Sequence, residues 1–370
     1  NIDASKILDS NGNFNSPIRY SERECENKRF FSVYSYGNWR NLNISEEHMV
    51  LVIDGNNLQK SRKIESGEKY RSKVKNGTGS AVLKSSVSSK MSIVRKEAKD
   101  LKDNDLVLFP APNCGEINLD KIDSWLIGAC IADGCISENH NNVKFTINKN
   151  EKIREVLFNY LSSRDYSKTV SSKKHGDGLG WRITVSTKES MEFFKKYITG
   201  KRENKKFTKE IFELDMESRL ALLGGYFDGD GSFSSKTGKL VAANCSKDMA
   251  DQIFSILLSC GIPASLNKKK SKIDKNKSFS TREIYYSISV PSSHVGKIAK
   301  YMVNNKINFV NIKKKRDFRF MWKDSESGTS YLCSKIRKIE SFIYNGSGYD
   351  LEINPTHALV SNGFVASNCR

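Results

Sequence analysis

The strongest constraint on the fold is an internal duplication in the middle of the chain. From residue 120 the apolar pattern predicts a helix, a strand, a helix, a strand and a helix, and this order recurs from residue 216. The expected elements lie at residues 120–133, 143–147, 151–162, 181–185 and 189–197, and again at 216–228, 240–243, 249–260, 285–290 and 295–303. The period of about 97 residues indicates a duplicated α/β unit of the αββαββα type.

The first helix of each copy ends in the same way, with small residues followed by Asp-Gly. One copy reads LIGACIADG through Asp133, and the other reads LGGYFDGDG through Asp230, 97 positions later. Small residues at fixed helical positions let two helices approach at the backbone. Each helix would then bring one carboxylate to its C-terminal end, and carboxylates are ligands for Mg²⁺. One such end is most often an ordinary turn, but two equivalent copies favour a paired cation site.

A strongly basic composition narrows the partners of such a site. The 370 residues include 61 Lys and Arg against 42 Asp and Glu, a formal net charge of +19. A chain this basic often binds a polyanion such as nucleic acid, although lysine-rich surfaces also serve solubility. An apolar content of 38% excludes a disordered chain, and no apolar stretch is long enough for a membrane span.

Cysteine and histidine spacing favours neither a disulfide scaffold nor a zinc site. The eight cysteines contain no CxxC pair, and none of the five histidines is spaced as a zinc-ligand pair. The first residues lack the pattern of a signal peptide. We therefore expect an intracellular protein, cytoplasmic or nuclear, with reduced thiols and no membrane partner.

Because of its two motifs, the segment at about 118–325 resembles the LAGLIDADG homing endonucleases. The second motif is the better match, since Ile131 stands where the family often has an acid. The resemblance implies that Asp133 and Asp230 bind Mg²⁺, or Mn²⁺ in its place, for two-metal hydrolysis of both DNA strands. It also implies a saddle of strands that binds a long, asymmetric double-stranded DNA target in the major groove. We expect a monomer.

A basic segment before the second motif supplies a candidate catalytic lysine. Residues 201–208 read KRENKKFT, and intein-borne members of the family carry a Lys-x-Ile-Pro-like segment at a similar distance. The resemblance implies that its lysine polarises the hydrolytic water or the scissile phosphate. Lys205 matches the position best. Because Phe and Thr replace Ile and Pro, Lys206 is the alternative, and a solvated charge run is the plainer interpretation. Lys306 and Lys313 are candidates in the second repeat.

Further basic residues are candidates for DNA contacts. The polar, basic stretch at 58–93 reads as an insertion, and the runs at 268–272 and 313–316 suit phosphate contacts. Side chains on strands are expected to reach base edges. The candidates are Lys144, Arg182, Lys268, Lys269, Lys270, Lys313 and Lys314, with Thr146 and Thr184 on the same strands as the first two. Each run alone is equally compatible with a solvated surface.

The end of the chain indicates a second kind of chemistry. An Asn directly before a Cys, as in Asn368-Cys369, can cyclise, because its side-chain amide attacks its own carbonyl and breaks the bond to the Cys. The Cys thiolate is a nucleophile for acyl shifts, and His357 and Asp350 could assist proton transfer. This segment resembles the C-terminal splicing motifs of inteins, except that Ser367 replaces the common penultimate His.

The beginning of the chain resembles the N-terminal half of an intein. The segment from Ser45 to His48 resembles a Thr-x-x-His motif, whose His activates the first peptide bond, and the residues after Asn1 resemble the opening motif. No Cys or Ser stands at the first position, so we expect the chain as written to be inactive in splicing. Host polypeptides, the exteins, would flank it covalently before splicing.

Together these features predict an α/β plus all-β protein. A β-rich, horseshoe-like Hint splicing domain is expected at residues 1–117 and 326–370, with a LAGLIDADG endonuclease inserted at 118–325. The two repeats of the endonuclease are expected at about 118–215 and 216–325.

Two other interpretations remain open. One is a free-standing endonuclease with a decayed splicing domain, which would not need the intact Asn368-Cys369 pair. The other is a nucleic-acid-binding LAGLIDADG protein that no longer cleaves, which would not need both acids. Site-specific cutting of DNA separates the second from the enzyme.

Overall fold

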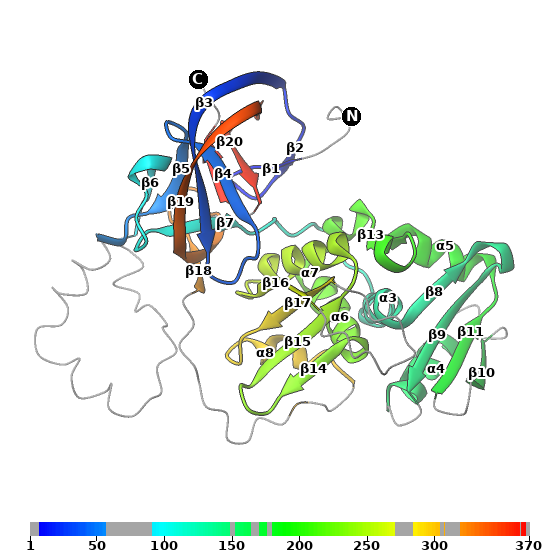
Figure 1. The fold of residues 1–370 in the computed structure, drawn as a ribbon. Helices are drawn as coiled ribbons and strands as arrows, with labels where there is room; N and C mark the ends of the chain where they lie inside the picture. The colour runs from blue at the N-terminus through cyan, green and yellow to red at the C-terminus, as the bar shows by residue number, and fades with distance from the viewer. Residues whose placement is uncertain are drawn as a thin grey trace, which may run out of the picture. The chain divides into compact units, whose positions relative to one another are not determined.

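The chain folds into two compact units (Figure 1). Unit 1 comprises Asn1–Asn113, Gly261–Pro263 and Lys314–Arg370, and unit 2 comprises Cys114–Cys260 and Ala264–Lys313. In sequence, unit 2 therefore interrupts unit 1. The computed structural model describes residues 7–56, 91–148, 152–163, 170–175, 180–270, 284–303, 307, 319–362 and 364–367. Most of the basic stretch predicted as an insertion thus lies outside the described residues.

Unit 1 is built from strands. Its main sheet has nine strands in the order β20-β21-β5-β7-β19-β3-β4, with β18 paired to β19 and β6 paired to β5. These strands are β3 (Arg19–Ser35), β4 (Asn41–Ser45), β5 (Met49–Ile53), β6 (Ile93–Glu97), β7 (Leu106–Pro110), β18 (Arg319–Lys323), β19 (Ser330–Glu352), β20 (Ala358–Ser361) and β21 (Phe364–Ser367). A small separate sheet pairs β1 (Ile7–Leu8) with β2 (Phe14–Asn15). The β-rich character expected of these outer segments is confirmed.

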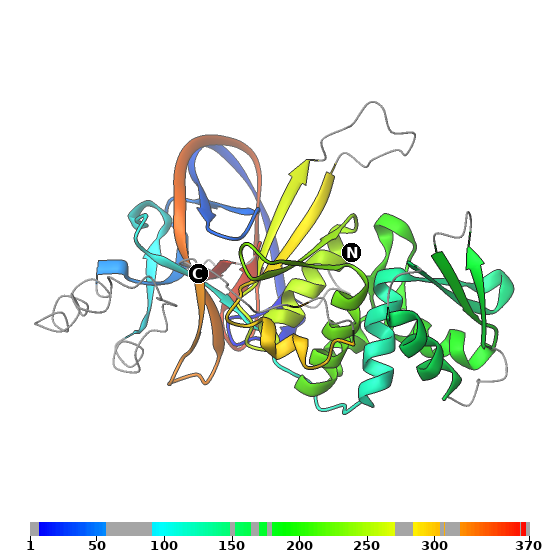
Figure 2. The same cartoon turned by 90° about the horizontal axis from the view of Figure 1, so that it is seen from below.

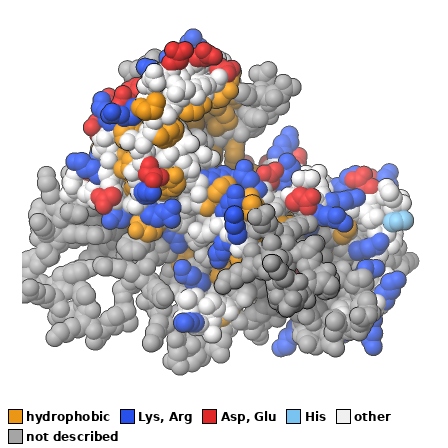
Figure 3. All heavy atoms as spheres, viewed as in Figure 1, with side chains coloured by type: hydrophobic (Ala, Val, Ile, Leu, Met, Phe, Trp, Pro, Cys, Tyr) orange, Lys and Arg blue, Asp and Glu red, His pale blue; other side chains and the backbone are white. Residues whose placement is uncertain are grey.

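Two long strands dominate unit 1. β3 and β19 pair antiparallel from Ser35 opposite Ile336 to Arg19 opposite Glu352, and their far ends form a two-stranded ribbon. Glutamates at 22, 24 and 26 are exposed on this ribbon, where Figure 3 shows acidic side chains gathered. The ribbon thus does not share the strongly basic character of the whole chain.

Unit 2 contains two copies of one arrangement, as the duplication predicts. The first copy consists of α3 (Lys121–Asp133), β8 (Gly134–Ser137), β9 (Asn142–Asn148), α4 (Ile153–Ser162), β10 (Val170–His175), β11 (Gly180–Val185) and α5 (Lys188–Tyr197). The second consists of α6 (Met216–Gly229), β14 (Gly231–Ser234), β15 (Lys239–Asn244), α7 (Lys247–Ser259), β16 (Ser265–Lys270), β17 (Ile284–Val290) and α8 (Val295–Ala299). Their sheets, β10-β11-β9-β8 and β16-β17-β15-β14, have the same topology. Each copy is therefore an αββαββα unit.

The structure differs from the expected elements in detail. Four strands were not located by the apolar pattern, namely β8, β10, β14 and β16. β10 is polar and basic apart from its first residue, so it carries no strand-like alternation. The last helix ends at Ala299, four residues before the expected end, and turns follow it. Among the described residues, no helix is long and apolar enough to cross a membrane.

Polar side chains fix where the longer helices begin. The Asp120 carboxylate accepts hydrogen bonds from two backbone amides of α3, and Asp215 accepts one from Ser218 in α6. Thr187 and Ser246 cap α5 and α7 in the same way. Such caps satisfy amides that have no partner within the helix. The starts of the two acidic helices, and hence the positions of their ends, follow from these residues.

Helices α3 and α6 touch at the backbone through two glycines. A Cβ on Gly128 would lie 1.9 Å from the carbonyl oxygen of Leu222, and a Cβ on Gly225 would lie 2.0 Å from that of Trp125. The contacts are reciprocal, because Gly128 and Gly225 stand 97 positions apart, as do Trp125 and Leu222. The two copies therefore meet around a local two-fold axis. Any larger residue at either glycine would push the helices apart.

We predict that Gly128→Ala destabilises unit 2 by about 1–3 kcal/mol, the range for overpacking a tight core. A urea titration followed by tryptophan fluorescence should show an earlier transition. Gly296→Ala is the matched control, because nothing lies within 4 Å of its would-be Cβ on α8. That change should leave stability equal or slightly higher. Equal effects of the two substitutions would contradict the close approach of the helices.

Candidate functional site

The C-terminal ends of α3 and α6 bring two carboxylates together. Asp133 is the last residue of α3, and Asp230 caps the end of α6. A Cβ on Gly229, the residue before Asp230, would lie 2.7 Å from Asp133 Oδ2 and 2.6 Å from the Cβ of Ala132. One acid from each repeat thus lies at the same point of the helix pair. Asp133 therefore lies against the residue that precedes Asp230, and both acids act on the charge of Lys205.

Lys205 reaches the same place from the segment between the repeats. Its Nζ donates hydrogen bonds to the backbone oxygens of Cys130 and Gly134, each 2.8 Å away, at the end of α3. Burial lowers the pKa of the Lys205 ammonium. The charges of Cys130, Asp230 and Asp133 act in the opposite direction and offset part of that shift. The Lys205 amine therefore lies near the two acids, held by two backbone oxygens.

Local geometry explains why Lys205 and not its neighbour points to the acids. The short strands β12 (Ile198–Thr199) and β13 (Lys206–Phe207) pair antiparallel, and Gln252 of α7 holds Phe207 by two hydrogen bonds of 2.8 and 2.9 Å. Lys206 instead lies 3.4 Å from Asp248, in an exposed ion pair. The structure therefore places Lys205, the lysine that matches the family segment best, near the acids, whereas Lys206 pairs with Asp248. Lys306 and Lys313 lie outside the described residues.

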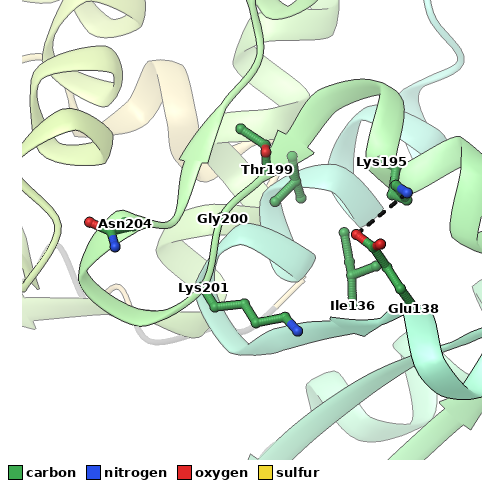
Figure 4. A pocket seen from close by; sticks show the side chains of 8 residues that line it. Ile136, Glu138, Lys195, Thr199, Gly200, Lys201 and Asn204 are labelled. Carbon is green, nitrogen blue, oxygen red and sulfur yellow. Dashed lines mark ion pairs between the residues drawn. The ribbon is translucent and has the colours of Figure 1, made fainter.

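A tight loop and a pocket adjoin this segment. Gly200 has a φ of +74°, and a Cβ there would lie 2.0 Å from the Asn204 oxygen, so the turn before Lys205 requires glycine. Between this loop and the end of β8 is an open pocket of about 360 Å³ (Figure 4). Glu138 and Lys195 form an ion pair, 3.4 Å apart, at its side.

The ends of α3 and α6 suit a divalent cation. Each helix places the negative end of its dipole and one carboxylate there, an arrangement that is unfavourable without a balancing cation. Within the described residues, no three acidic, His or Cys side chains gather into a metal site. Mg²⁺ does not need such a cage, since it is commonly held by one or two carboxylates, waters and substrate phosphates. Asp133 and Asp230 fit that mode of binding.

The sheet of the first repeat turns a polar, basic face away from its core. Val143, Phe145 and Ile183 are fully buried on one side. The alternate residues of β9 and β11 lie on the other side, where Arg182 pairs with Thr146 and Thr184 pairs with Lys144. All four predicted strand side chains therefore share one face. Sequence analysis missed Lys173 of β10, which stands opposite Arg182 and extends the row.

The corresponding face of the second repeat carries fewer basic side chains. Its central row consists of Ser232, Val241 and Ser289, with Ser265 at the end. Lys239 lies on the same face of β15 as Val241. In the exposed run 268–270, alternation along β16 puts only the middle lysine on this face. β16 and β17 project together as a hairpin, as Figure 2 shows. Lys313 and Lys314 lie outside the described residues.

The residues predicted for splicing lie in unit 1. In the sheet, β21 lies between β20, which begins directly after His357, and β5, which begins directly after His48. Ala366 of β21 stands opposite Val50 of β5, so the chain before Asn368 passes close to both histidines.

The described partners of these residues are mostly local. His357 is exposed, has a φ of +49°, and its Nδ1 lies 3.8 Å from Glu352. His48 Nδ1 lies 3.4 Å from the Ser45 hydroxyl. Asp350 stands on β19 opposite Ser21. Asn368 and Cys369 lie outside the described residues.

Comparison with known families bears on unit 2. Residues 217–314 match the LAGLIDADG-like domain family. Part of the second repeat is therefore similar to a LAGLIDADG-like domain. This match covers α6 with Asp230 and the elements of the second repeat that follow it.

Curated relatives are much longer proteins with different names. The chain is similar to the replication factor C small subunit of Methanocaldococcus jannaschii, with 30% identity over 203 residues, 54% of this chain and 10% of that protein. It is also similar to transcription initiation factor IIB of the same organism, at 25% over 281 residues, 75% of this chain and 35% of that protein. A DNA polymerase of Thermococcus hydrothermalis is 21% identical over 377 residues, 95% of this chain and 20% of that protein. The chain thus spans 10–35% of the length of these relatives.

Solved structures give weaker likenesses. The crystal structure of I-DmoI in complex with DNA and Mn is 13% identical, with a TM-score of 0.33, over 48% of this chain and 96% of that chain. Full-length DUF199/WhiA from Thermatoga maritima is 12% identical, with a TM-score of 0.35, over 50% of this chain and 56% of that chain.

We predict that the two acids bind a divalent cation jointly. Calorimetric titration with Mn²⁺ should show a site that Asp133→Asn and Asp230→Asn each weaken at least tenfold, since each change removes a charged oxygen ligand. Asp248→Asn is the control, because that carboxylate is exposed and paired with Lys206. Unchanged Mn²⁺ affinity in both acid variants would contradict the assignment.

Proposed function

We propose that this protein is a site-specific double-strand DNA endonuclease embedded in a protein-splicing element. The observation that carries the endonuclease is the meeting of Asp133, Asp230 and Lys205 at the ends of two helices. The LAGLIDADG-like match over residues 217–314 supports it. A basic sheet face in the same unit supplies a surface for DNA.

The arrangement suits hydrolysis of both strands. The strands of a duplex are antiparallel, and the two acids are related by the local two-fold axis of the helix pair, so each repeat can serve one strand. Bound Mg²⁺, or Mn²⁺ in its place, supplies the charge that stabilises the attacking and leaving oxygens of a phosphodiester. Asp133 and Asp230 hold the cations. Lys205 is fixed by two carbonyls, and its ammonium faces the scissile phosphate or the hydrolytic water.

DNA binding divides between base contacts and phosphate contacts. In this proposal Lys144, Lys173 and Arg182 reach base edges from the first sheet, where Arg and Lys suit guanine. The exposed lysines of the β16 hairpin contact phosphates, which position the protein without reading sequence. The second face presents serine hydroxyl groups with Lys239 and Lys269 for its half of the site. Because the side chains of the two faces differ, we propose a long target with two unlike halves.

The proposed splicing element rests on two observations. First, unit 1 is continuous in space but interrupted in sequence by unit 2, as expected when one gene is inserted into another. Second, a replication factor, a transcription factor and DNA polymerases share a similar segment that is a minor part of each. An element that moves between unrelated host genes explains such a distribution. His48, His357 and Asp350 would assist the acyl shifts, and Asn368 would cyclise before Cys369.

The endonuclease is tested on DNA of the host gene with this coding segment removed. We predict that the wild-type chain cuts this DNA at one site with Mg²⁺. Asp230→Asn should abolish cutting while DNA binding survives, because the variant keeps the surface but loses a cation ligand. Lys205→Met should lower the cleavage rate at least a hundredfold, whereas the control Lys206→Met should remain within about threefold.

Two experimental results would contradict or change the proposed endonuclease function. Cutting at the wild-type rate by Asp230→Asn would refute the assigned site. Specific binding of the same DNA without cutting, by the wild-type chain, would favour the non-cleaving interpretation.

The splicing element is tested in the natural precursor, with host sequence on both sides. We predict that the bond after Asn368 breaks, and that Asn368→Ala keeps it intact because alanine has no amide to cyclise. Mass spectrometry of the precursor and its products measures this. The control Asn362→Ala changes an Asn between β20 and β21 and should not block the break. Cleavage after residue 368 in Asn368→Ala would rule out the proposed cyclisation.

A further inference from the structure

The second acidic motif contains another carboxylate, two residues before Asp230. Asp228 is completely buried in α6. Its Oδ2 accepts a hydrogen bond of 2.9 Å from the indole N–H of Trp125 in α3 and one of 2.8 Å from the backbone N–H of Val303, which follows α8. One carboxylate oxygen thus joins three parts of unit 2.

The first repeat has no carboxylate at the equivalent position, and the equivalent of Trp125 has no indole N–H that would require one. Ile131 stands 97 positions before Asp228, and Leu222 stands 97 positions after Trp125. Both are fully buried. Asp228 of α6 thus occurs together with the indole N–H of Trp125 in α3. At the equivalent positions, Ile131 of α3 occurs together with Leu222 of α6. Buried polar groups need partners and apolar groups do not, so each pair is consistent within itself.

We infer that Asp228 is a positioning residue that locks α6 to α3 and to the segment after α8, and that it binds no cation. This inference rests on the proposed function for its consequence, since the lock holds the helix crossing that sets Asp133 beside Asp230. Without the carboxylate, the Trp125 indole and the Val303 amide lose a buried acceptor. The helix ends would then shift, although both acids would remain.

The hydrogen bond between Asp228 and Trp125 can be tested first without measuring DNA cleavage. In the full chain labelled with ¹⁵N-tryptophan, Trp125→Phe assigns one of the four indole N–H signals. We expect the Trp125 indole hydrogen to exchange slowly in the wild type and in Asp228→Asn, which keeps an oxygen acceptor. In Asp228→Ala it should exchange at least tenfold faster. Equal exchange rates of the Trp125 indole hydrogen in the wild type and in Asp228→Ala would contradict the positioning role of Asp228.

Melting temperatures give a second readout. If Asp228 acts through Trp125, Trp125→Phe should add little to the loss caused by Asp228→Ala, because the two changes remove the same hydrogen bond. Fully additive losses of melting temperature in the double variant would contradict the positioning role of Asp228. Asp228→Asn keeps the acceptor, so Trp125→Phe should still cause its full loss in that background, which serves as the control.

Cleavage then separates positioning from cation binding. Asp228→Asn should keep kcat within about threefold of the wild type, whereas Asp230→Asn should be inactive. An inactive Asp228→Asn with a protected indole would show that Asp228 acts at the cation, against the inference. A wild-type chain that cuts no DNA would refute the proposed function. The exchange rate of the Trp125 indole hydrogen would still test the positioning role of Asp228.

Discussion

The backbone contact between α3 and α6 is the interaction on which the rest of unit 2 depends. Gly128 and Gly225 let the two helices approach until a carbonyl of one fills the space where the other would carry a side chain. Because the two helices approach this closely, Asp133 lies against Gly229, the residue before Asp230. Both sheets begin directly after the helix ends, so the same contact sets how far each face stands from the acids.

Sequence alone predicts this centre well because its signals are local and repeated. Small residues, a final Asp-Gly and a fixed period mark both helices. The sequence favours Lys205 over Lys206 by its position in the segment alone. The contacts that orient this segment, the pairing of β12 with β13 and the hydrogen bonds with Gln252, 47 positions beyond Lys205, are not visible in the sequence. Lys173 was missed since β10 is too polar to be recognised as a strand. Burial of Asp228 against Trp125 likewise depends on a contact between distant segments.

The two repeats share a backbone plan but differ in chemistry. A buried acid with an indole in one corresponds to two aliphatic side chains in the other. The sheet faces also differ, with Lys144, Lys173 and Arg182 on the first and Lys239 and Lys269 on the second. The net charge of +19 is thus a property of particular surfaces, since the ribbon of unit 1 carries exposed glutamates.

Two helices held together by glycines would present one acid each to shared cations. Anomalous diffraction from crystals grown with Mn²⁺ tests this arrangement most directly. We expect Mn²⁺ peaks in contact with the carboxylates of Asp133 and Asp230, with the Lys205 side chain beside them and Asp228 uncoordinated. Peaks bound elsewhere, or an ion held by Asp228 in place of Asp230, would contradict it.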